Sequence, residues 1–229
     1  MQTAIVTGAS GNLGQAVVKK FIENGFHVTG TILHNDASVM DFPTDRFEAK
    51  VVDLSSEAGA ATFVQSVLEK NKSVDAAVLT VGGFAAGKIV DTPTADILKQ
   101  YQLNFETAYN IARPVFTQML LQGYGRIFLI GSRPGLDAKS GKGMVAYGLA
   151  KSLIFRLAEL MNDEAKGHNV VTNVIVPSTI DTPQNRKSMP DANFDNWVKA
   201  EDIADIISYY CSAEAKTLRE PIIKVYGNA

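Results

Sequence analysis

Short apolar runs and amphipathic stretches alternate from one end of the chain to the other. Strand-like runs occupy residues 3–7, 27–33, 47–52, 76–81, 126–130, 170–176 and 222–225. Apolar residues recur at helical spacing over residues 13–23, 57–70, 96–121, 145–164 and 200–211. Pro114 predicts a kink or a break in the third of these helices. Several strand-like runs are continuous rather than alternating, which indicates parallel strands covered on both faces.

This alternation predicts a single α/β domain over residues 1–229. The expected fold is a doubly wound Rossmann fold, with a mostly parallel seven-stranded sheet and helices on both faces. Three long segments, residues 82–94, 132–144 and 178–199, each follow a strand and therefore belong at carboxyl ends. Open α/β sheets bind their ligands at that edge, so we expect the functional residues there.

Composition and charge exclude several classes of function. The chain has 229 residues, of which 46% are hydrophobic and 20% charged, and its formal net charge is −2. That balance gives no general attraction to nucleic acid or to an anionic membrane, and leaves a small-molecule substrate. One cysteine and three histidines without ligand spacing predict neither a disulfide framework nor a metal site. No secretory leader or run of transmembrane length is seen, so a cytoplasmic location is expected.

The first strand runs directly into a glycine-rich turn, T-G-A-S-G-N-L-G, and then into a helix. Strand, glycine turn and helix in that order is the context that a dinucleotide site requires. Gly8 permits the tight turn, Gly11 leaves the backbone bare where a pyrophosphate approaches, and Gly14 allows close packing of helix on sheet. The helix N-terminus offers N–H groups and a positive dipole end to phosphate. We expect cofactor contacts from Gly8, Ser10, Gly11, Asn12, Leu13 and Gly14.

The second strand ends without the acidic residue that usually holds the ribose of NAD. It reads G-T-I-L-H-N-D, with Ile32 and Leu33 in the expected neighbourhood. Because a carboxylate is missing there, nothing repels a 2′-phosphate, and Thr31, His34 and Asn35 can donate hydrogen bonds to one. The pattern favours NADP(H) over NAD(H), and no arginine is present to strengthen that preference.

A tyrosine and a lysine four residues apart open a predicted helix, in A-Y-G-L-A-K. At this spacing Tyr147 and Lys151 lie on one face of the helix. An ammonium beside a phenol favours the phenolate and lowers its pKa from about 10 towards neutrality. Such a tyrosine can donate a proton to a developing alkoxide and recover it later. The preceding strand ends at Ser132, whose hydroxyl can hydrogen-bond a substrate oxygen.

Together these residues resemble the short-chain dehydrogenase/reductase family over essentially the whole chain. Besides the glycine turn and Y-x-x-x-K, the shared motifs are V-D-L at residues 52–54, T-V-G-G at 80–83, Q-L-N-F-E-T at 102–107, a serine at 132 and N-V-I-V-P-S-T-I-D-T from residue 173. Three departures stand out. The middle glycine comes one position early, Ser178 replaces a glycine, and Ser132 lies slightly farther from Tyr147 than is commonest.

The resemblance implies a role for each matching residue. Tyr147 would be the general acid/base, and Lys151 would bind the nicotinamide ribose and lower the tyrosine pKa. Ser132 would orient the reacting group, and Asn104 would support Lys151 through a water relay. Further cofactor contacts are implied at Asp53 and Leu54 for the adenine, at Thr80, Val81 and Gly82 for the middle, and at Pro177, Ile180 and Thr182 for the nicotinamide.

Within that family, the chain is most similar to the dihydropteridine reductases. The similarity rests on D-T-P-Q-N-R-K-S-M-P-D-A-N-F-D-N-W from residue 181, V-G-G-F-A-A-G after the fourth strand and G-M-V-A-Y-G-L-A-K around the tyrosine. The chain differs from them in lacking an acid after the second strand and in carrying Ser132. We expect residues 178–199 to form a substrate lid, with polar contacts from Asn185 and Arg186 and an apolar surface from Met189 and Trp197.

The leading hypothesis is an NAD(P)H-dependent oxidoreductase that reduces a quinonoid dihydropterin, with Tyr147 handling the proton. The first alternative is a carbonyl reductase acting on a ketone or 3-oxoacyl group, which Ser132 and the missing acid favour. The second is a dinucleotide-binding sensor without chemistry. Residues 96–121 and 145–164 resemble the family's dimerising helices, which implies a homodimer or a homotetramer.

Overall fold

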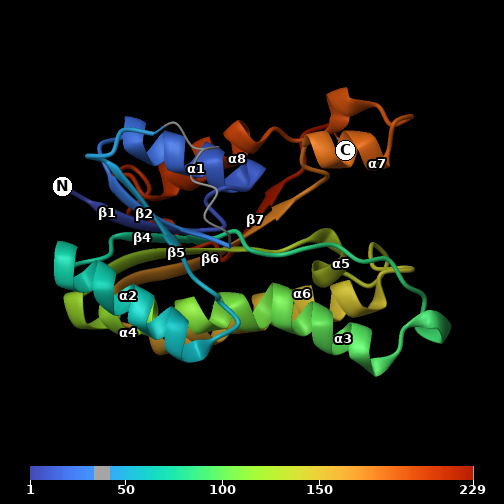
Figure 1. Ribbon diagram of the computed structural model, residues 1–229, viewed down its shortest axis with the longest axis horizontal. Coiled ribbons are helices and arrows are strands. Elements are labelled where there is room, and N and C mark those ends of the chain that lie inside the picture. The colour runs from blue at the N-terminus through green and yellow to red at the C-terminus, as the bar shows by residue number, and fades with distance from the viewer. Residues whose placement is uncertain (34–41, 229) are drawn as a thin grey trace.

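The centre of the protein is one parallel sheet, seen in a computed structural model that describes residues 1–33 and 42–228 (Figure 1). Seven strands of the described chain are ordered β3-β2-β1-β4-β5-β6-β7, and each neighbouring pair is parallel. The strands are β1 Thr3–Thr7, β2 His27–Ile32, β3 Phe47–Val51, β4 Ala76–Leu79, β5 Tyr124–Ile130, β6 Asn169–Pro177 and β7 Ile222–Val225. The predicted doubly wound sheet is confirmed.

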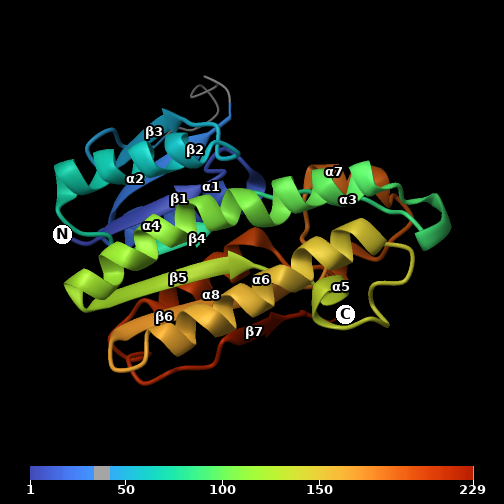
Figure 2. The ribbon, with the colours of Figure 1, turned by 90° about the horizontal axis from the view of Figure 1, so that it is seen from below.

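Helices cover both faces of this sheet. α1 and α8 lie on one face, and α2, α4 and α6 lie on the other, as Figures 1 and 2 show. The described helices are α1 Asn12–Glu23, α2 Glu57–Asn71, α3 Thr94–Tyr101, α4 Thr107–Gln122, α5 Arg133–Leu136, α6 Val145–Glu164, α7 Pro183–Ser188 and α8 Ala200–Tyr210. Local residues fix their ends. Ser56 caps α2 by accepting a hydrogen bond from the Gly59 N–H, and Gly123 ends α4 in the left-handed region.

Two apolar cores result, one on each face. Ile111 of α4 and Ile127 of β5 belong to the core under α2, α4 and α6. Phe21 of α1 and Phe128 of β5 belong to the core under α1 and α8. Adjacent residues of β5 therefore point into different cores, which is the physical reason why its residues 127–130 are all apolar.

The strand order creates a change of direction beside β1. From β1 the chain winds outward to β2 and β3, and then crosses back to β4 on the other side. Such a switch point at the carboxyl ends of the strands is where open α/β sheets bind ligands. The segments that follow β4, β5 and β6 reach the same edge, at the right of Figure 1 beside α3, α5 and α7.

The helix expected over residues 96–121 differs from the prediction. It is interrupted by a π-helical turn, Gln102–Glu106, which joins α3 to α4. Of the kink or break predicted at Pro114, the break is wrong, because α4 continues through it. A proline removes only one backbone hydrogen bond, and the buried side chains of Ile111 and Val115 hold this part of α4 against the sheet. The π turn places Asn104 at the functional edge.

Residues 178–199 form an excursion whose two ends meet. It contains α7 and a 3₁₀ turn, Phe194–Asn196. At its base, Ile180 pairs with Val198 in a parallel bridge. The Asp181 N–H donates to the Val198 carbonyl at 2.8 Å, and the Val198 N–H donates to the Thr179 carbonyl at 3.0 Å. The excursion is therefore closed at its base beyond the end of β6.

Candidate active site

The glycine turn after β1 brings the backbone of α1 into contact with the backbone of the turn itself. Gly8 has a φ of +63°, in the left-handed region that favours glycine. A Cβ on Gly14 would lie 2.1 Å from the Gly8 carbonyl oxygen, so only glycine fits at that position of α1. Gly11 precedes α1 in an extended conformation, and no side chain caps the helix there. The bare N-terminal N–H groups of α1 can therefore receive a phosphate, as a dinucleotide site requires.

Two threonines support this turn from the neighbouring strands. The buried Thr31 hydroxyl accepts a hydrogen bond from the Gly8 N–H at 3.3 Å. The Thr80 hydroxyl donates to the Thr7 carbonyl at 2.6 Å. Both residues were predicted as direct cofactor contacts, and the structure places them against the protein's own backbone. They fix the shape of the turn that would hold the cofactor.

The region predicted to bind the adenosine is described in part. Ile32 is buried and Leu33 is 67% exposed, with no carboxylate on either. His34 and Asn35 lie outside the described residues. Asp53 is exposed, and hydrogen bonds from Ser55 hold its pKa below the ordinary range of a carboxyl group.

Asn110 is a supporting residue that the sequence analysis did not identify. Its side-chain amide donates to the carbonyl of Leu54 at 2.9 Å. Leu54 is itself buried, so this bond fixes the backbone of the V-D-L motif beside α4. No sequence signal marked Asn110, because the contact joins residues far apart in the chain.

Ser132, Tyr147 and Lys151 meet where β5 and α6 approach the carboxyl edge. The Ser132 hydroxyl lies close enough to the Tyr147 phenol to lower its pKa. Ser132 also caps α5, because its hydroxyl accepts from the Gly135 N–H at 3.3 Å. A Cβ on Gly135 would lie 2.7 Å from Lys151 backbone and side-chain atoms, so α5 packs directly on α6. Despite the longer segment between them, Ser132 and Tyr147 therefore remain close together.

The pKa of Tyr147 differs from the sequence-based expectation. Burial raises it above the ordinary value, and the nearby Ser132 hydroxyl opposes that shift without overcoming it. Lys151 was expected to lower it, but the Lys151 ammonium is directed at the Ile130 carbonyl, to which it donates at 2.7 Å. Burial also lowers the pKa of Lys151 itself to about 8. Desolvation is therefore the largest cause of both shifts.

Asn104 holds the loop after β4 rather than contacting Lys151 directly. Its side chain accepts from the Gly83 N–H at 3.0 Å and donates to the Gly83 carbonyl at 2.9 Å. A Cβ on Gly82 would lie 2.7 Å from Asn104 Oδ1 and 3.2 Å from Lys151 Nζ. Gly82 therefore keeps an exposed backbone beside the lysine ammonium. The close approach fits a coenzyme lying over this loop.

Phe84 is a residue at this edge that the sequence analysis did not single out. Its ring meets the ring of Tyr147 edge to face, with centroids 5.3 Å apart, and the residue is 63% exposed. The loop after β4, which carries Phe84, is held by hydrogen bonds between Gly87 and the start of α6. One of them joins the Val145 N–H to the Gly87 carbonyl at 3.0 Å. Phe84 therefore presents an aromatic surface beside the predicted proton donor.

The excursion after β6 has its own internal support. Pro177 is buried at the end of β6, and the Thr182 hydroxyl caps α7 by accepting from Asn185 N–H. The Asn185 amide donates to the Ile180 carbonyl at 2.8 Å. Two of the predicted polar contacts, Thr182 and Asn185, are thus already engaged in holding the base of the excursion.

Arg186 is likewise engaged within the excursion. It forms two hydrogen bonds with the Asp181 carboxylate, at 2.6 and 2.7 Å, and lies over the Phe194 ring at 4.6 Å. Phe194 in turn packs on Trp197, with ring centroids 4.8 Å apart. Met189 is 40% exposed. Trp197, one of the apolar residues predicted to contact the substrate, therefore packs on Phe194, whose ring lies under the Arg186 guanidinium.

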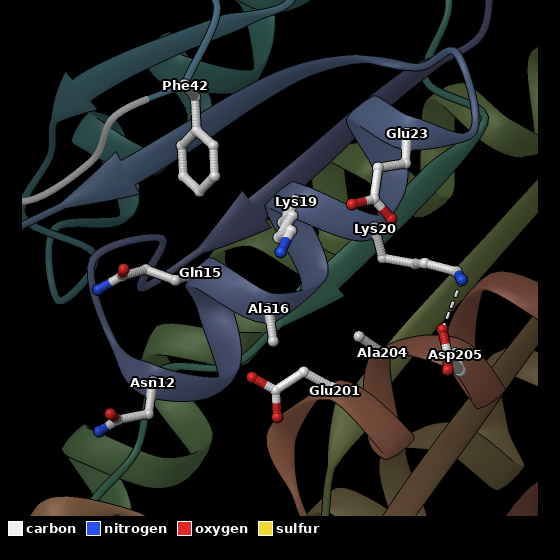
Figure 3. Close-up of a pocket in the computed structure, with 10 residues that line it drawn as sticks. All are labelled: Asn12, Gln15, Ala16, Lys19, Lys20, Glu23, Phe42, Glu201, Ala204 and Asp205. Atoms are coloured by element: carbon white, nitrogen blue, oxygen red, sulfur yellow. Dashed lines mark ion pairs between the residues drawn. The ribbon is translucent and has the colours of Figure 1, made fainter.

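A hollow of about 540 Å³ lies away from this edge, between α1 and α8 (Figure 3). Lys19, Phe42 and Glu201 help to line it, and Lys20 forms an ion pair with Asp205 at 2.6 Å along its wall. Asn12 is the residue that it shares with the predicted dinucleotide turn. Among the described residues, no group of three His, Cys, Asp or Glu is arranged to hold a metal ion. No helix within residues 1–33 and 42–228 is long and apolar enough to cross a membrane.

A parallel sheet with a glycine turn at its switch point, and a phenol and a buried ammonium at the same edge, has the features of an α/β dehydrogenase. The chain belongs to the short chain dehydrogenase family, whose model matches residues 2–193. It is therefore an oxidoreductase of a family that uses NAD(P)(H). The bare N-terminus of α1 and the glycine contacts fit such a coenzyme.

Individual relatives cover nearly the whole chain at low identity. The 3-oxoacyl-(acyl-carrier-protein) reductase FabG of Buchnera aphidicola is 24% identical, covering 99% of this chain and 96% of its own. The dihydropteridine reductase of Dictyostelium discoideum is 26% identical, covering 96% and 92%. A solved short-chain type dehydrogenase/reductase from Mycobacterium ulcerans superposes with a TM-score of 0.90 at 21% identity, covering 99% of this chain and 89% of that one.

Proposed function

We propose that this protein is an NAD(P)H-dependent reductase of a planar conjugated ring, with a quinonoid dihydropterin as the best substrate. The observation that carries this proposal is the exposed Phe84 ring packed against Tyr147. A flat ring stacked on an aromatic surface would be held beside the phenol that handles the proton. The similarity to a dihydropteridine reductase, and the aromatic pair Phe194 and Trp197 in the excursion, support the same substrate class.

Each residue of the site has a part in this reaction. The nicotinamide coenzyme, when bound, supplies the hydride. Tyr147 would donate the proton to the acceptor and regain one from solvent, and Ser132 would hold the acceptor or the phenol in line. Lys151 would place its ammonium beside Gly82, where the ribose of the coenzyme is expected. Closure of residues 178–199 would exclude water from the acceptor.

We also infer a preference for NADP(H) over NAD(H). Its support is the end of β2, where Ile32 and Leu33 place no carboxylate that would repel a 2′-phosphate. The measurement is a pair of titrations of the purified protein with NADPH and NADH. The preference predicts the lower dissociation constant for NADPH, and a clear preference for NADH would refute it.

A carbonyl reductase is the second candidate, and the closeness of the Ser132 hydroxyl to Tyr147 favours it. A ketone oxygen can receive both hydroxyl hydrogen bonds, whereas a conjugated pterin ring can accept a hydride without Ser132. The similarity to a 3-oxoacyl reductase supports this class as well. An assay of both quinonoid dihydropterin and a 3-oxoacyl thioester, with the preferred coenzyme, distinguishes pterin reduction from carbonyl reduction. Faster turnover of the thioester would move the assignment to carbonyl reduction.

The proton-transfer role is tested by Tyr147→Phe. This change removes one hydroxyl and keeps the ring contact with Phe84. We expect kcat to fall by about 10²- to 10⁴-fold, the usual contribution of a positioned acid or base. Coenzyme affinity should stay close to that of the wild type. If the variant kept a near wild-type kcat, Tyr147 would not be the general acid. If the wild type oxidised neither NADH nor NADPH with any acceptor, a dinucleotide sensor would be the better assignment.

A further inference from the structure

A side-chain contact at the candidate active-site edge joins the ends of β5 and β7 across the end of β6, which lies between them. Arg133 follows Ser132 beyond the end of β5, and Tyr226 follows β7. The end of β6 lies between them, because the sheet order there is β5-β6-β7. The Arg133 guanidinium carbon lies 3.9 Å from the centroid of the Tyr226 ring. This cation–π contact therefore spans the end of β6.

Ser178 fastens the end of β6 to the same segment. Its N–H donates to the Val225 carbonyl at 2.9 Å, and its hydroxyl donates to the Tyr226 carbonyl at 2.9 Å. The preceding residue, Pro177, is paired with Val225 in the sheet. The serine at 178, which stands where the family usually has glycine, thus supplies a second bond that a glycine could not make.

The contact is sheltered enough to hold its geometry. Arg133 and Tyr226 are both partly buried, and Tyr226 packs against the core beneath α6. A guanidinium stacked on a ring gains strength as water is excluded, and its planar shape makes the contact directional. Arg133 is also the first residue of α5, the helix that Ser132 caps. A shift of the guanidinium would therefore shift the serine next to it.

We propose that Arg133, Tyr226 and Ser178 form a clasp that positions Ser132 relative to the nicotinamide end of the coenzyme site. These are positioning residues, because they act through Ser132 and Pro177. The inference rests on the proposed function in one respect, namely that Ser132 faces the acceptor while Pro177 and its neighbours face the nicotinamide. It adds a reason for the Ser178 departure and a role for a tyrosine outside the family's motifs.

The decisive pair of variants is Tyr226→Leu and Tyr226→Phe. The leucine removes the aromatic face, and the phenylalanine keeps it as a matched control. For Tyr226→Leu we expect kcat with quinonoid dihydropterin to fall about two- to fivefold, and the dissociation constant of NADPH to rise by a similar factor. The fall in kcat should exceed any change in the KM for the acceptor, because the clasp acts on the acceptor only through the position of Ser132. Tyr226→Phe should restore both values to near those of the wild type.

Arg133→Met provides a second test that leaves the packing of Tyr226 in place. It should reproduce the loss seen with Tyr226→Leu, even if the leucine variant folds poorly. The clasp is wrong if Arg133→Met keeps wild-type kcat and coenzyme affinity, or if Tyr226→Phe loses as much as Tyr226→Leu. Failure of the proposed function would look different. The wild type would then not turn over the pterin, while NADPH affinity would still distinguish the two Tyr226 variants.

Discussion

The ammonium of Lys151 is buried. The residue is 5% exposed, and its Nζ donates to the Ile130 carbonyl at 2.7 Å. Burial lowers its pKa to about 8, so keeping the charge at pH 7 costs folding free energy. A group that destabilises the fold and lies beside the predicted proton donor is a sign of function, because stability alone would replace it with an apolar side chain.

This leads to a prediction for Lys151→Met. The variant should lose activity and yet be more stable than the wild type at pH 7, by up to about 3 kcal/mol. The cost of the buried charge is fully present below pH 8 and fades as the pH rises towards 10.5, the ordinary value of a lysine. The stability difference should therefore narrow between pH 8 and 10.5. Urea unfolding at pH 7 and pH 10 measures it.

The exposed Lys139 provides the control for that experiment. Lys139→Met removes a charge of the same kind from solvent, so its unfolding free energy should stay near that of the wild type at both pH values. A Lys151→Met protein less stable than the wild type at pH 7 would show that the hydrogen bond to Ile130 outweighs the cost of burial.

Single residues also show where sequence-based prediction stops. Tyr147, Lys151 and Ser132 could be identified because their spacing is read along one helix and one strand end. The raised pKa of Tyr147 could not, because it depends on burial by segments distant in sequence. Phe84 was missed for a related reason, since its contact with Tyr147 depends on how the loop after β4 folds back. The roles of these residues stay predictions, and their electrostatic environment could be described only from the fold.

At the scale of elements, α1 is held against the turn before it more closely than a side chain allows. The Gly14 backbone lies against the Gly8 carbonyl group. Because both partners are backbone atoms, neither can move aside by a change of side-chain rotamer. The sequence correctly placed this turn between β1 and α1. It did not show that Thr31 and Thr80 would support the turn from below. Turn and support act as one rigid cradle.

Gly14→Ala tests that cradle. The new Cβ would lie 2.1 Å from the Gly8 carbonyl oxygen, so the turn or the helix must move. We expect a loss of about 1–3 kcal/mol in unfolding free energy and a rise of at least about tenfold in the dissociation constant of NADPH. Chemical unfolding and a coenzyme titration measure the two effects.

Gly59→Ala is a milder helical control, because its Cβ would lie 3.3 Å from the Asp53 carbonyl oxygen and the Ser56 side chain and needs only a small local shift. It should leave coenzyme affinity unchanged. An unperturbed NADPH affinity in Gly14→Ala would show that the close approach of α1 is not needed for binding.

At the scale of the whole molecule, α4 and α6 carry an apolar surface that faces solvent in the single chain. Its exposed residues include Tyr109 and Leu121 on α4 and Leu149, Leu153 and Leu160 on α6. These helices lie side by side on one face of the sheet (Figure 2). Large exposed apolar side chains on adjacent helices favour association, and the resemblance to the family's dimerising helices points to a second copy of this chain.

The prediction is that the wild type is a homodimer or homotetramer through this surface. Leu153→Glu combined with Leu160→Glu would bury like charges at a symmetric interface and should shift the protein to smaller species. Light scattering coupled to size-exclusion chromatography gives the mass. The exposed Ile89→Glu, beyond the end of β4, is the control that should leave the mass unchanged. A wild type that is monomeric at micromolar concentration would refute the assignment.

The closed base of the excursion has a consequence for how such a protein diversifies. Because Ile180 and Val198 meet in a bridge, the seventeen residues between them leave and rejoin the molecule at nearly one point. A chain segment attached in this way can be lengthened, shortened or exchanged by mutation without shifting the register of any strand. Natural selection can then alter this segment while the sheet and the turn between β1 and α1 are inherited intact.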